Sequence, residues 1–137
     1  MTAAPPFSFP VRVYYEDTDA AGVVYYANYL KFMERARTEW LAALGLPLAR
    51  FEREHGVAFV VQRCEIDYRA PARLNDALAA TVEVVDRGAA RLVLRQHVLR
   101  DEALLTTALV TLACIDTTRW RPTRIPEPLM HRLETSA

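Results

Sequence analysis

The chain is poor in the residues that several common enzyme classes need. Its only serines, Ser8 and Ser136, lie near the two ends of the sequence, and no Gly-x-Ser-x-Gly motif is present. Lys31 is the only lysine, and the glycines are isolated from one another. A phosphate-binding P-loop and a glycine-rich dinucleotide-binding motif therefore cannot be written. These absences exclude ordinary serine-hydrolase chemistry and nucleotide cofactors held by such loops.

Cysteine and histidine are also scarce. Cys64 and Cys114 lie far apart in apolar segments typical of strands, which favours buried free thiols over a disulfide. The histidines, His55, His97 and His131, are not spaced as the ligands of a zinc site. We therefore expect neither a disulfide framework nor bound zinc.

Length, composition and net charge further restrict the class of protein. The 137 residues are 52% hydrophobic and 25% charged, which is typical of one soluble folded domain. The 17 basic residues balance the 17 acidic residues, so no overall field attracts nucleic acid or anionic lipid. The first ten residues do not read as a signal peptide, and the most apolar segment, Ala103–Ile115, is too short for a membrane-spanning helix. We expect a cytoplasmic protein with no integral membrane segment and no nucleic-acid partner.

The spacing of apolar residues predicts a helical region followed by strands. Val11–Tyr15 alternates and is expected to form a first strand. From Asn28 to Gly45 apolar residues recur every three or four positions, which predicts a long amphipathic helix, and residues 47–55 can form a short second one. The four further predicted strands are Val57–Arg69, Ala77–Arg87, Arg91–Arg100 and Ala103–Ile115. The short connections make the last three antiparallel, and one helix on such a sheet leaves edge strands open for dimerisation.

The most informative chemistry lies between the first strand and the long helix, in the segment Tyr14-Tyr15-Glu16-Asp17-Thr18-Asp19-Ala20-Ala21-Gly22. Its carboxylates precede a helix N-terminus, whose free N–H groups and dipole stabilise a developing oxyanion. An ionised aspartate can act as a nucleophile or, with a raised pKa, as a general base, so the segment suits acyl chemistry. Two alternatives stay open. Asp17 or Asp19 caps backbone amides in an acidic turn, or the Asp-x-Asp pair binds a hard metal ion.

A long contiguous run, VRVYYEDTDAAGVVYYANYLKFMERARTEWL, closely resembles the signature of the hotdog-fold acyl-CoA thioesterases of the 4-hydroxybenzoyl-CoA thioesterase family. It is most similar to the branch associated with the Tol–Pal cell-envelope system. Further matches are Val57–Val61, the stretch from Tyr68 to Asp76, and Arg87-Gly88. The resemblance implies an α+β hotdog fold, with a five-stranded antiparallel sheet wrapped around one long central helix. A single domain would span residues 1–137, with residues 1–9 and 129–137 as peripheral tails.

The resemblance also implies an activity: hydrolysis of an acyl-CoA to a free acid and CoA, with no metal and no organic cofactor. Asp19 matches the catalytic carboxylate of the family, which either attacks the thioester or activates water. The backbone N–H of Tyr26 matches the oxyanion hole, and Gly22, Val23 and Tyr25 would contact the substrate. Tyr26 occupies a position where Tol–Pal-associated relatives often have histidine. A mechanism that depends on that histidine is therefore not expected.

The remaining expectations concern partners. Arg87 and Arg91, on either side of Gly88, are candidate contacts for the phosphates of CoA. Hotdog thioesterases build their active sites at dimer interfaces, so the resemblance implies a homo-oligomer, either a dimer or a tetramer. The acyl group stays open between short-chain, hydroxyacyl and aromatic types. The alternatives are a substrate carried on acyl carrier protein, or a non-catalytic adaptor of the Tol–Pal system that binds acyl thioesters. For the location, the alternative to a cytoplasmic protein is one peripheral at the inner membrane.

Overall fold

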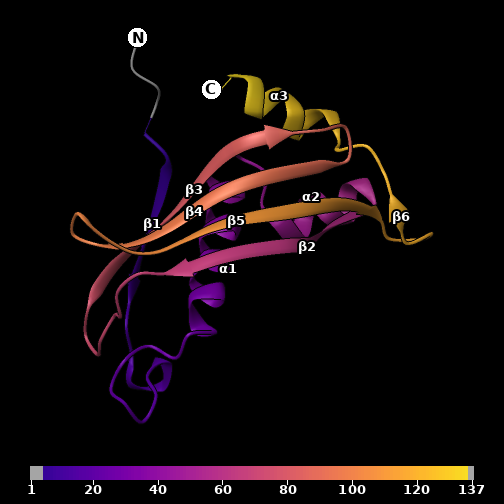
Figure 1. Ribbon diagram of the computed structural model, residues 1–137. Helices are drawn as coiled ribbons and strands as arrows, with labels where there is room; N and C mark the ends of the chain where they lie inside the picture. Colours follow the sequence, from indigo (N-terminus) through magenta and orange to yellow (C-terminus); the bar gives the residue numbers. More distant parts are fainter. Residues whose placement is uncertain (1–4, 136–137) are drawn as a thin grey trace.

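A computed structural model describes residues 5–135, and Figure 1 shows a curved sheet with helices packed around it. The elements in chain order are β1 (Phe7–Arg12), the short 3-10 helix η1 (Tyr15–Asp17), α1 (Asn28–Ala43), α2 (Leu48–His55), β2 (Val57–Tyr68), β3 (Ala77–Arg87), β4 (Arg91–Arg100), β5 (Ala103–Asp116), β6 (Arg121–Pro122) and α3 (Glu127–Thr135). Strands β3 and β4 have the predicted bounds, and β2 and β5 differ from prediction by one residue at one end.

The sheet is antiparallel throughout, as predicted. Its strands pair in the order β1-β3-β4-β5-β2, and the two-residue strand β6 pairs with the end of β5. Strands β3, β4 and β5 form the expected meander through short turns. Strand β2 lies at one edge of the sheet and β1 at the other. Within the described residues the sheet therefore has six strands instead of five.

Helix α1 packs against one face of the sheet and buries the apolar side chains that its sequence spacing predicted. Phe32, Met33 and Ala36 are fully buried, and they belong to the same core as Leu94 of β4 and Val110 of β5. Gln96 of β4 is also fully buried in this layer, where its amide donates to the Met33 and Thr81 carbonyls at 3.0 and 3.1 Å. A satisfied polar group at the centre of the core fixes how the helix lies on the sheet.

A single central helix is not confirmed, because the described chain has three α-helices: α1 and α2 match the predicted long and short helices, and α3 was not predicted. Helix α3 begins two residues before the segment 129–137 that was expected to be a peripheral tail, and its Leu129 and Leu133 are buried in the core. These two leucines are four residues apart and so lie on the same face of the helix. The segment that precedes α3 is bonded to the sheet by two backbone hydrogen bonds. The Thr123 N–H donates to the Cys114 carbonyl, and the Ile125 N–H donates to the Ala89 carbonyl.

The first strand also differs from the prediction. It covers Phe7–Arg12, where an N-terminal tail up to residue 9 was expected, and it pairs with β3 from Phe7 opposite Val82. The alternation of Phe7, Ser8 and Phe9 gives one partly buried apolar side, and Pro10 is tolerated because β1 is an edge strand. Residues 1–4 and 136–137 lie outside the described range. Across the described residues, no helix has the length and apolar character needed to cross a membrane.

Candidate functional site

The loop between β1 and α1 folds back on itself and presents Asp19 at its tip. Thr18 and Val24 form an isolated antiparallel bridge, and the Asp19 N–H donates to the Val23 carbonyl at 2.9 Å. The Gly22 N–H then donates to the Asp19 carbonyl at 3.0 Å, which closes a four-residue turn. Gly22 has a φ of +81°, a conformation that glycine adopts without strain.

The side chain of Asp19 is exposed, and one of its oxygens helps to hold the turn. Its Oδ1 accepts the Ala21 N–H at 2.9 Å, which is the geometry of an Asx turn. No group of the described residues is recorded as donating to Oδ2. The carboxylate is thus oriented by its own backbone, while one oxygen faces solvent and is available for chemistry.

Asp17 has a different role from Asp19, although the two lie two residues apart. Its side chain is buried, and its Oδ2 accepts the Tyr14 N–H at 2.8 Å. Its carbonyl accepts the Tyr25 N–H and the Asn28 side-chain amide, both at 2.9 Å. Asp17 therefore connects the end of β1 to the start of α1. The predicted alternative of aspartates capping backbone amides is confirmed for both residues, and for Asp19 it leaves the second oxygen available.

The segment that enters α1 is aromatic. Tyr25 and Tyr26 are exposed, with ring centroids 4.9 Å apart, and contact with Tyr26 raises the pKa of the Tyr25 hydroxyl. The Tyr68 hydroxyl at the end of β2 donates to the Tyr26 carbonyl at 2.9 Å. Among the described residues, no backbone carbonyl accepts the Tyr26 N–H. That N–H lies one residue before Ala27, the N-cap of α1, and so is near the positive end of the helix dipole.

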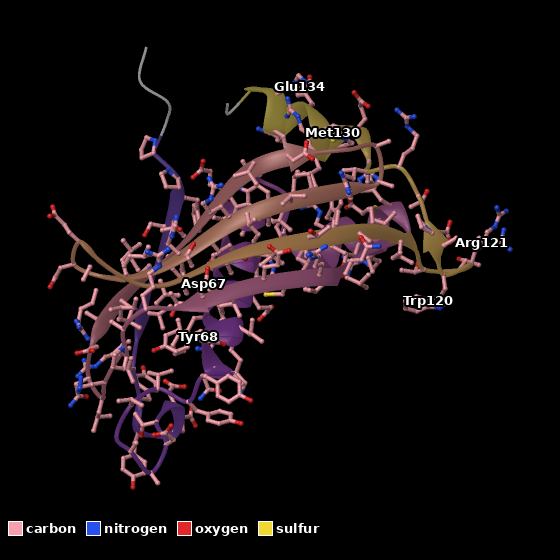
Figure 2. All side chains as sticks on the ribbon, in the orientation of Figure 1. Asp67, Tyr68, Trp120, Arg121, Met130 and Glu134 are labelled. Carbon is pink, nitrogen blue, oxygen red and sulfur yellow. The ribbon has the colours of Figure 1, made fainter. Side chains whose placement is uncertain are left out.

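A cavity of about 270 Å³ lies beside these tyrosines. Tyr29 is buried there, its hydroxyl accepts the Ala72 N–H at 3.0 Å, and desolvation raises its pKa. Burial also raises the pKa of Tyr68, so both rings are neutral phenols at pH 7. Figure 2 labels Tyr68 at the end of β2 nearest this loop. The residues that line the cavity are Val24, Tyr26, Tyr29, Tyr68, Arg69, Ala70 and Pro71.

An ion pair holds the chain segment that begins with the cavity residues Arg69, Ala70 and Pro71. Arg100 on β4 lies 2.8 Å from the Asp76 carboxylate and also donates to the Pro71 carbonyl at 3.3 Å. The same Asp76 oxygen accepts the Arg73 N–H at 2.8 Å. The Arg73 amide and the Arg100 guanidinium together lower the pKa of Asp76. The Val23–Arg73 bridge then joins this braced segment to the Asp19 loop.

Arg87 and Arg91 lie far from Asp19 within one chain. They flank the β3–β4 turn, whereas the Asp19 loop is bonded to the segment that precedes Ala77 at the opposite end of β3. An 11-residue strand spans about 35 Å. Arg91 lies 3.6 Å from Asp86 in an exposed ion pair. A single chain therefore does not bring the predicted phosphate contacts to the predicted catalytic carboxylate.

The alternative of a metal site at Asp17 and Asp19 finds no further ligands. Within residues 5–135, no group of three His, Cys, Asp or Glu side chains is placed to hold a metal ion. The buried Asp17 carboxylate accepts the Tyr14 N–H, and Oδ1 of Asp19 accepts the Ala21 N–H, so each carboxylate already has a backbone donor. Both cysteines are free, as predicted, and burial raises the pKa of Cys114 to about 11.

Sequence reasoning assigned no role to two residues that line the tyrosine cavity, Tyr68 and Arg69. They lie more than 40 positions after Tyr26 in the chain. Tyr68, the last residue of the edge strand β2, reaches this region through its hydrogen bond to Tyr26 and through its ring, whose centroid lies 5.6 Å from that of Tyr29 on α1. The only sequence signal for these two residues was that the stretch from Tyr68 to Asp76 matches the family pattern.

Comparisons with known proteins show the family to which the chain belongs. A family model described as the thioesterase-like superfamily matches residues 13–133. The acyl-CoA thioesterase YbgC of Haemophilus influenzae is 46% identical over 121 residues, which cover 88% of this chain and 89% of that protein. The acyl-CoA thioester hydrolase YbgC of Escherichia coli is 42% identical over 125 residues, which cover 90% of this chain and 92% of that protein.

Solved structures extend the likeness to three dimensions. The crystal structure of a probable thioesterase from Bartonella henselae matches with a TM-score of 0.83 and 35% identity, covering 89% of this chain and all of that one. The curled antiparallel sheet with its packed helices and the shared residue pattern thus define an enzyme of the thioesterase class. The chain belongs to the thioesterase-like superfamily, whose architecture is the hotdog fold.

Proposed function

We propose that the chain hydrolyses acyl-CoA thioesters to a free acid and CoA, with Asp19 as the catalytic carboxylate. The observation that carries this proposal is the Asp19 turn, which holds one carboxylate oxygen by a backbone amide and leaves the other exposed, in a loop that the Asp17 carbonyl joins to the Tyr25 N–H just before α1. Relatives at 42–46% identity are named acyl-CoA thioesterase or thioester hydrolase, which supports the same activity.

The chemistry follows from these groups. Asp19 either attacks the thioester carbonyl to give a mixed anhydride, which water then cleaves, or removes a proton from the attacking water. In both routes one water is consumed, the carbon–sulfur bond breaks, and the thiolate of CoA takes up a proton. In this proposal the Tyr26 N–H and the dipole of α1 stabilise the negative charge on the carbonyl oxygen. Gly22 and Val23 shape the turn, and the exposed Tyr25 ring is available to contact substrate.

A second copy of the chain would complete this site. Strand β2 is an unpaired edge with exposed Val60 and Val61, which suits antiparallel pairing with the β2 of a second copy across a two-fold axis. Such pairing sets the Tyr68 end of one β2 beside the Val57 end of the other.

The same pairing gives the two arginines a place in the site. Within each chain Val57 pairs with Asp116 and Arg91 pairs with Ala113, so the β3–β4 turn lies at the Val57 end of the sheet. We therefore assign Arg87 and Arg91 of one protomer to the CoA phosphates of its partner's substrate. The guanidinium groups can bind phosphate oxygens in pairs. Pairing of two such dimers into a tetramer is compatible with this assignment.

Steady-state release of CoA thiol from a panel of acyl-CoAs tests the proposed reaction. The panel should hold short-chain, long-chain, 3-hydroxyacyl and aromatic thioesters, assayed with and without a chelator. We expect many turnovers per protomer on at least one class and no effect of the chelator. If the protein releases thiol only from acyl carrier protein thioesters, the carrier of its substrate is acyl carrier protein and not CoA. Stoichiometric binding without release on every thioester would favour the adaptor and contradict the enzyme.

A further inference from the structure

The main chain of Tyr26 is held on both sides of its α-carbon, although its side chain is exposed. On one side the Tyr25 carbonyl accepts the Asn28 N–H at 2.8 Å. Because a trans peptide is planar, the Tyr26 N–H in the same peptide unit points in the opposite direction from that carbonyl. On the other side the Tyr26 carbonyl accepts the Tyr68 hydroxyl at 2.9 Å. In the described part of the chain, this is the one hydrogen bond made by the main chain of Tyr26.

Tyr68 gives this hydrogen bond a firm origin, because its own backbone belongs to the sheet. It pairs with the fully buried Thr106 of β5. The next two residues, Arg69 and Ala70, both donate to the Leu105 carbonyl, at 2.8 and 3.2 Å. The Tyr68 hydroxyl therefore ties the segment before α1 to a strand and not to another loop. Donor and acceptor belong to the same chain, so the bond does not require a second copy.

The Tyr68 ring is constrained by two further tyrosines. Its centroid lies 6.1 Å from that of Tyr26 and 5.6 Å from that of Tyr29, and both contacts are edge-to-face. Tyr29 is buried and anchored in turn, since its hydroxyl accepts the Ala72 N–H at 3.0 Å. Burial raises the pKa of Tyr68, so its hydroxyl keeps the proton that it donates at neutral pH. The donor thus reaches the Tyr26 carbonyl from a packed ring.

We propose that Tyr68 is a positioning residue for the hydrolysis: by holding the Tyr26 carbonyl, it keeps the Tyr26 N–H directed at the carbonyl oxygen of the thioester. This inference rests on the proposed function, in which that N–H stabilises the developing negative charge. A donor stabilises such charge best when its direction is fixed beforehand, because no reorganisation is then needed during the reaction. Tyr68 acts through the main chain and does not itself react. Loss of its hydroxyl should therefore slow the chemical step and leave substrate binding almost unchanged.

Amide NMR tests the structural half of the proposal without any substrate. The chain has six tyrosines, so selective isotope labelling of tyrosine nitrogen gives six backbone amide signals, and a Tyr26→Phe variant identifies the Tyr26 signal by its absence. We expect Tyr68→Phe to shift the Tyr26 amide signal. Tyr15→Phe is the matched control, because it removes the same hydroxyl from a side chain of the Asp19 loop that is 82% exposed, and it should leave the signal in place.

Steady-state kinetics test the functional half. Tyr68→Phe should lower kcat for CoA release about tenfold and leave KM within about twofold, whereas Tyr15→Phe should leave both within about twofold. Two further variants at position 68 isolate the donated proton. Para-aminophenylalanine keeps the ring and a donor and should restore kcat to within about threefold of the natural value. Para-methoxyphenylalanine keeps the oxygen without its proton and should behave as Tyr68→Phe. This pair decides the question if Tyr68→Phe does not fold.

The outcomes separate this inference from the proposed function. If the natural protein turns over, an unmoved Tyr26 signal or an undiminished kcat in folded Tyr68→Phe overturns the positioning role alone. A rise in KM without a fall in kcat would make Tyr68 a substrate contact and also overturns it. Equal kcat in the amino and methoxy variants has the same consequence. Absence of turnover by the natural protein on every thioester contradicts the proposed function, and this inference with it.

Discussion

At the scale of single residues, the position of the Asp19 carboxylate depends on Gly22. The turn closes through the Gly22 N–H, and the φ of +81° at Gly22 is a conformation that a side chain with a Cβ disfavours. A Cβ added at Gly22 would meet no atom within 4 Å, so substitution acts on the backbone alone. The Asp19 carboxylate is therefore sensitive to a residue that itself carries no reactive group.

Gly22→Ala and Gly22→Asn form a matched pair that tests this dependence. We expect Gly22→Ala to lower the free energy of unfolding by about 1 kcal/mol and to reduce kcat/KM. Gly22→Asn should be milder in both respects, because asparagine enters the left-handed region more readily than alanine. Chemical denaturation and CoA-release kinetics on both variants provide the measurements. Equal, undiminished kcat/KM in the two variants would show that the turn does not position Asp19.

At the scale of elements, the segment from Arg69 to Asp76 links the end of β2 to the Asp19 loop and depends on one carboxylate. Asp76 accepts hydrogen bonds from Arg73 and Arg100, and these lower its pKa in the folded protein. The unfolded chain therefore binds more protons than the folded chain in acid, so this contribution to stability is complete above the unfolded pKa of about 3.9. It is lost as the pH falls through the lowered folded pKa.

An Asp76→Asn variant should therefore be less stable than the natural protein at pH 7, by about 1–2 kcal/mol, because charge-assisted hydrogen bonds are lost. The difference should shrink as the pH falls below about 4, since Asp76 of the natural protein is then protonated as well. Urea unfolding at several pH values measures this. A difference that stays constant down to the acid limit would mean that the Asp76 charge does not stabilise the segment.

The elements also show how far the sequence could predict the fold. Alternation and turn residues were sufficient for β3 and β4, and the three-to-four spacing was sufficient for α1. The C-terminal helix α3 was harder to predict from the sequence. It is short, and the pair Leu129 and Leu133 marks an apolar face only once the rest of the fold is there for the helix to pack against. The Tyr68–Tyr26 hydrogen bond and the Arg37–Gln96 pair join residues 42 and 59 positions apart, which local patterns do not encode.

At the scale of the whole molecule, the account requires two chains for one complete site. Asp19 lies at one end of the sheet and the Arg87–Arg91 turn at the other, and the proposed edge pairing through β2 would bring one of each together. A subunit-mixing experiment tests this arrangement. One preparation carries Asp19→Asn, and the other carries Arg87→Ala together with Arg91→Ala.

Mixed dimers should recover activity that neither parent has at low acyl-CoA concentration. In an equal mixture, half of the dimers are mixed and each holds one native site, so about a quarter of the sites should work normally. Co-refolded protein and rate measurements well below KM provide the comparison. Activity equal to the mean of the two parents would place the arginines and Asp19 in the same chain, or the arginines outside the site.

The central claim is that the Asp19 carboxylate performs the hydrolysis, and one comparison tests it most directly. Asp19→Asn keeps an oxygen that can accept the Ala21 N–H, so the turn should survive, whereas Glu16→Gln makes the same acid-to-amide change at an exposed position of the same loop. We predict that kcat for CoA release falls by about 10²-fold or more in Asp19→Asn, with an unchanged melting temperature, and stays within about twofold in Glu16→Gln. Undiminished turnover by a folded Asp19→Asn protein would contradict the account.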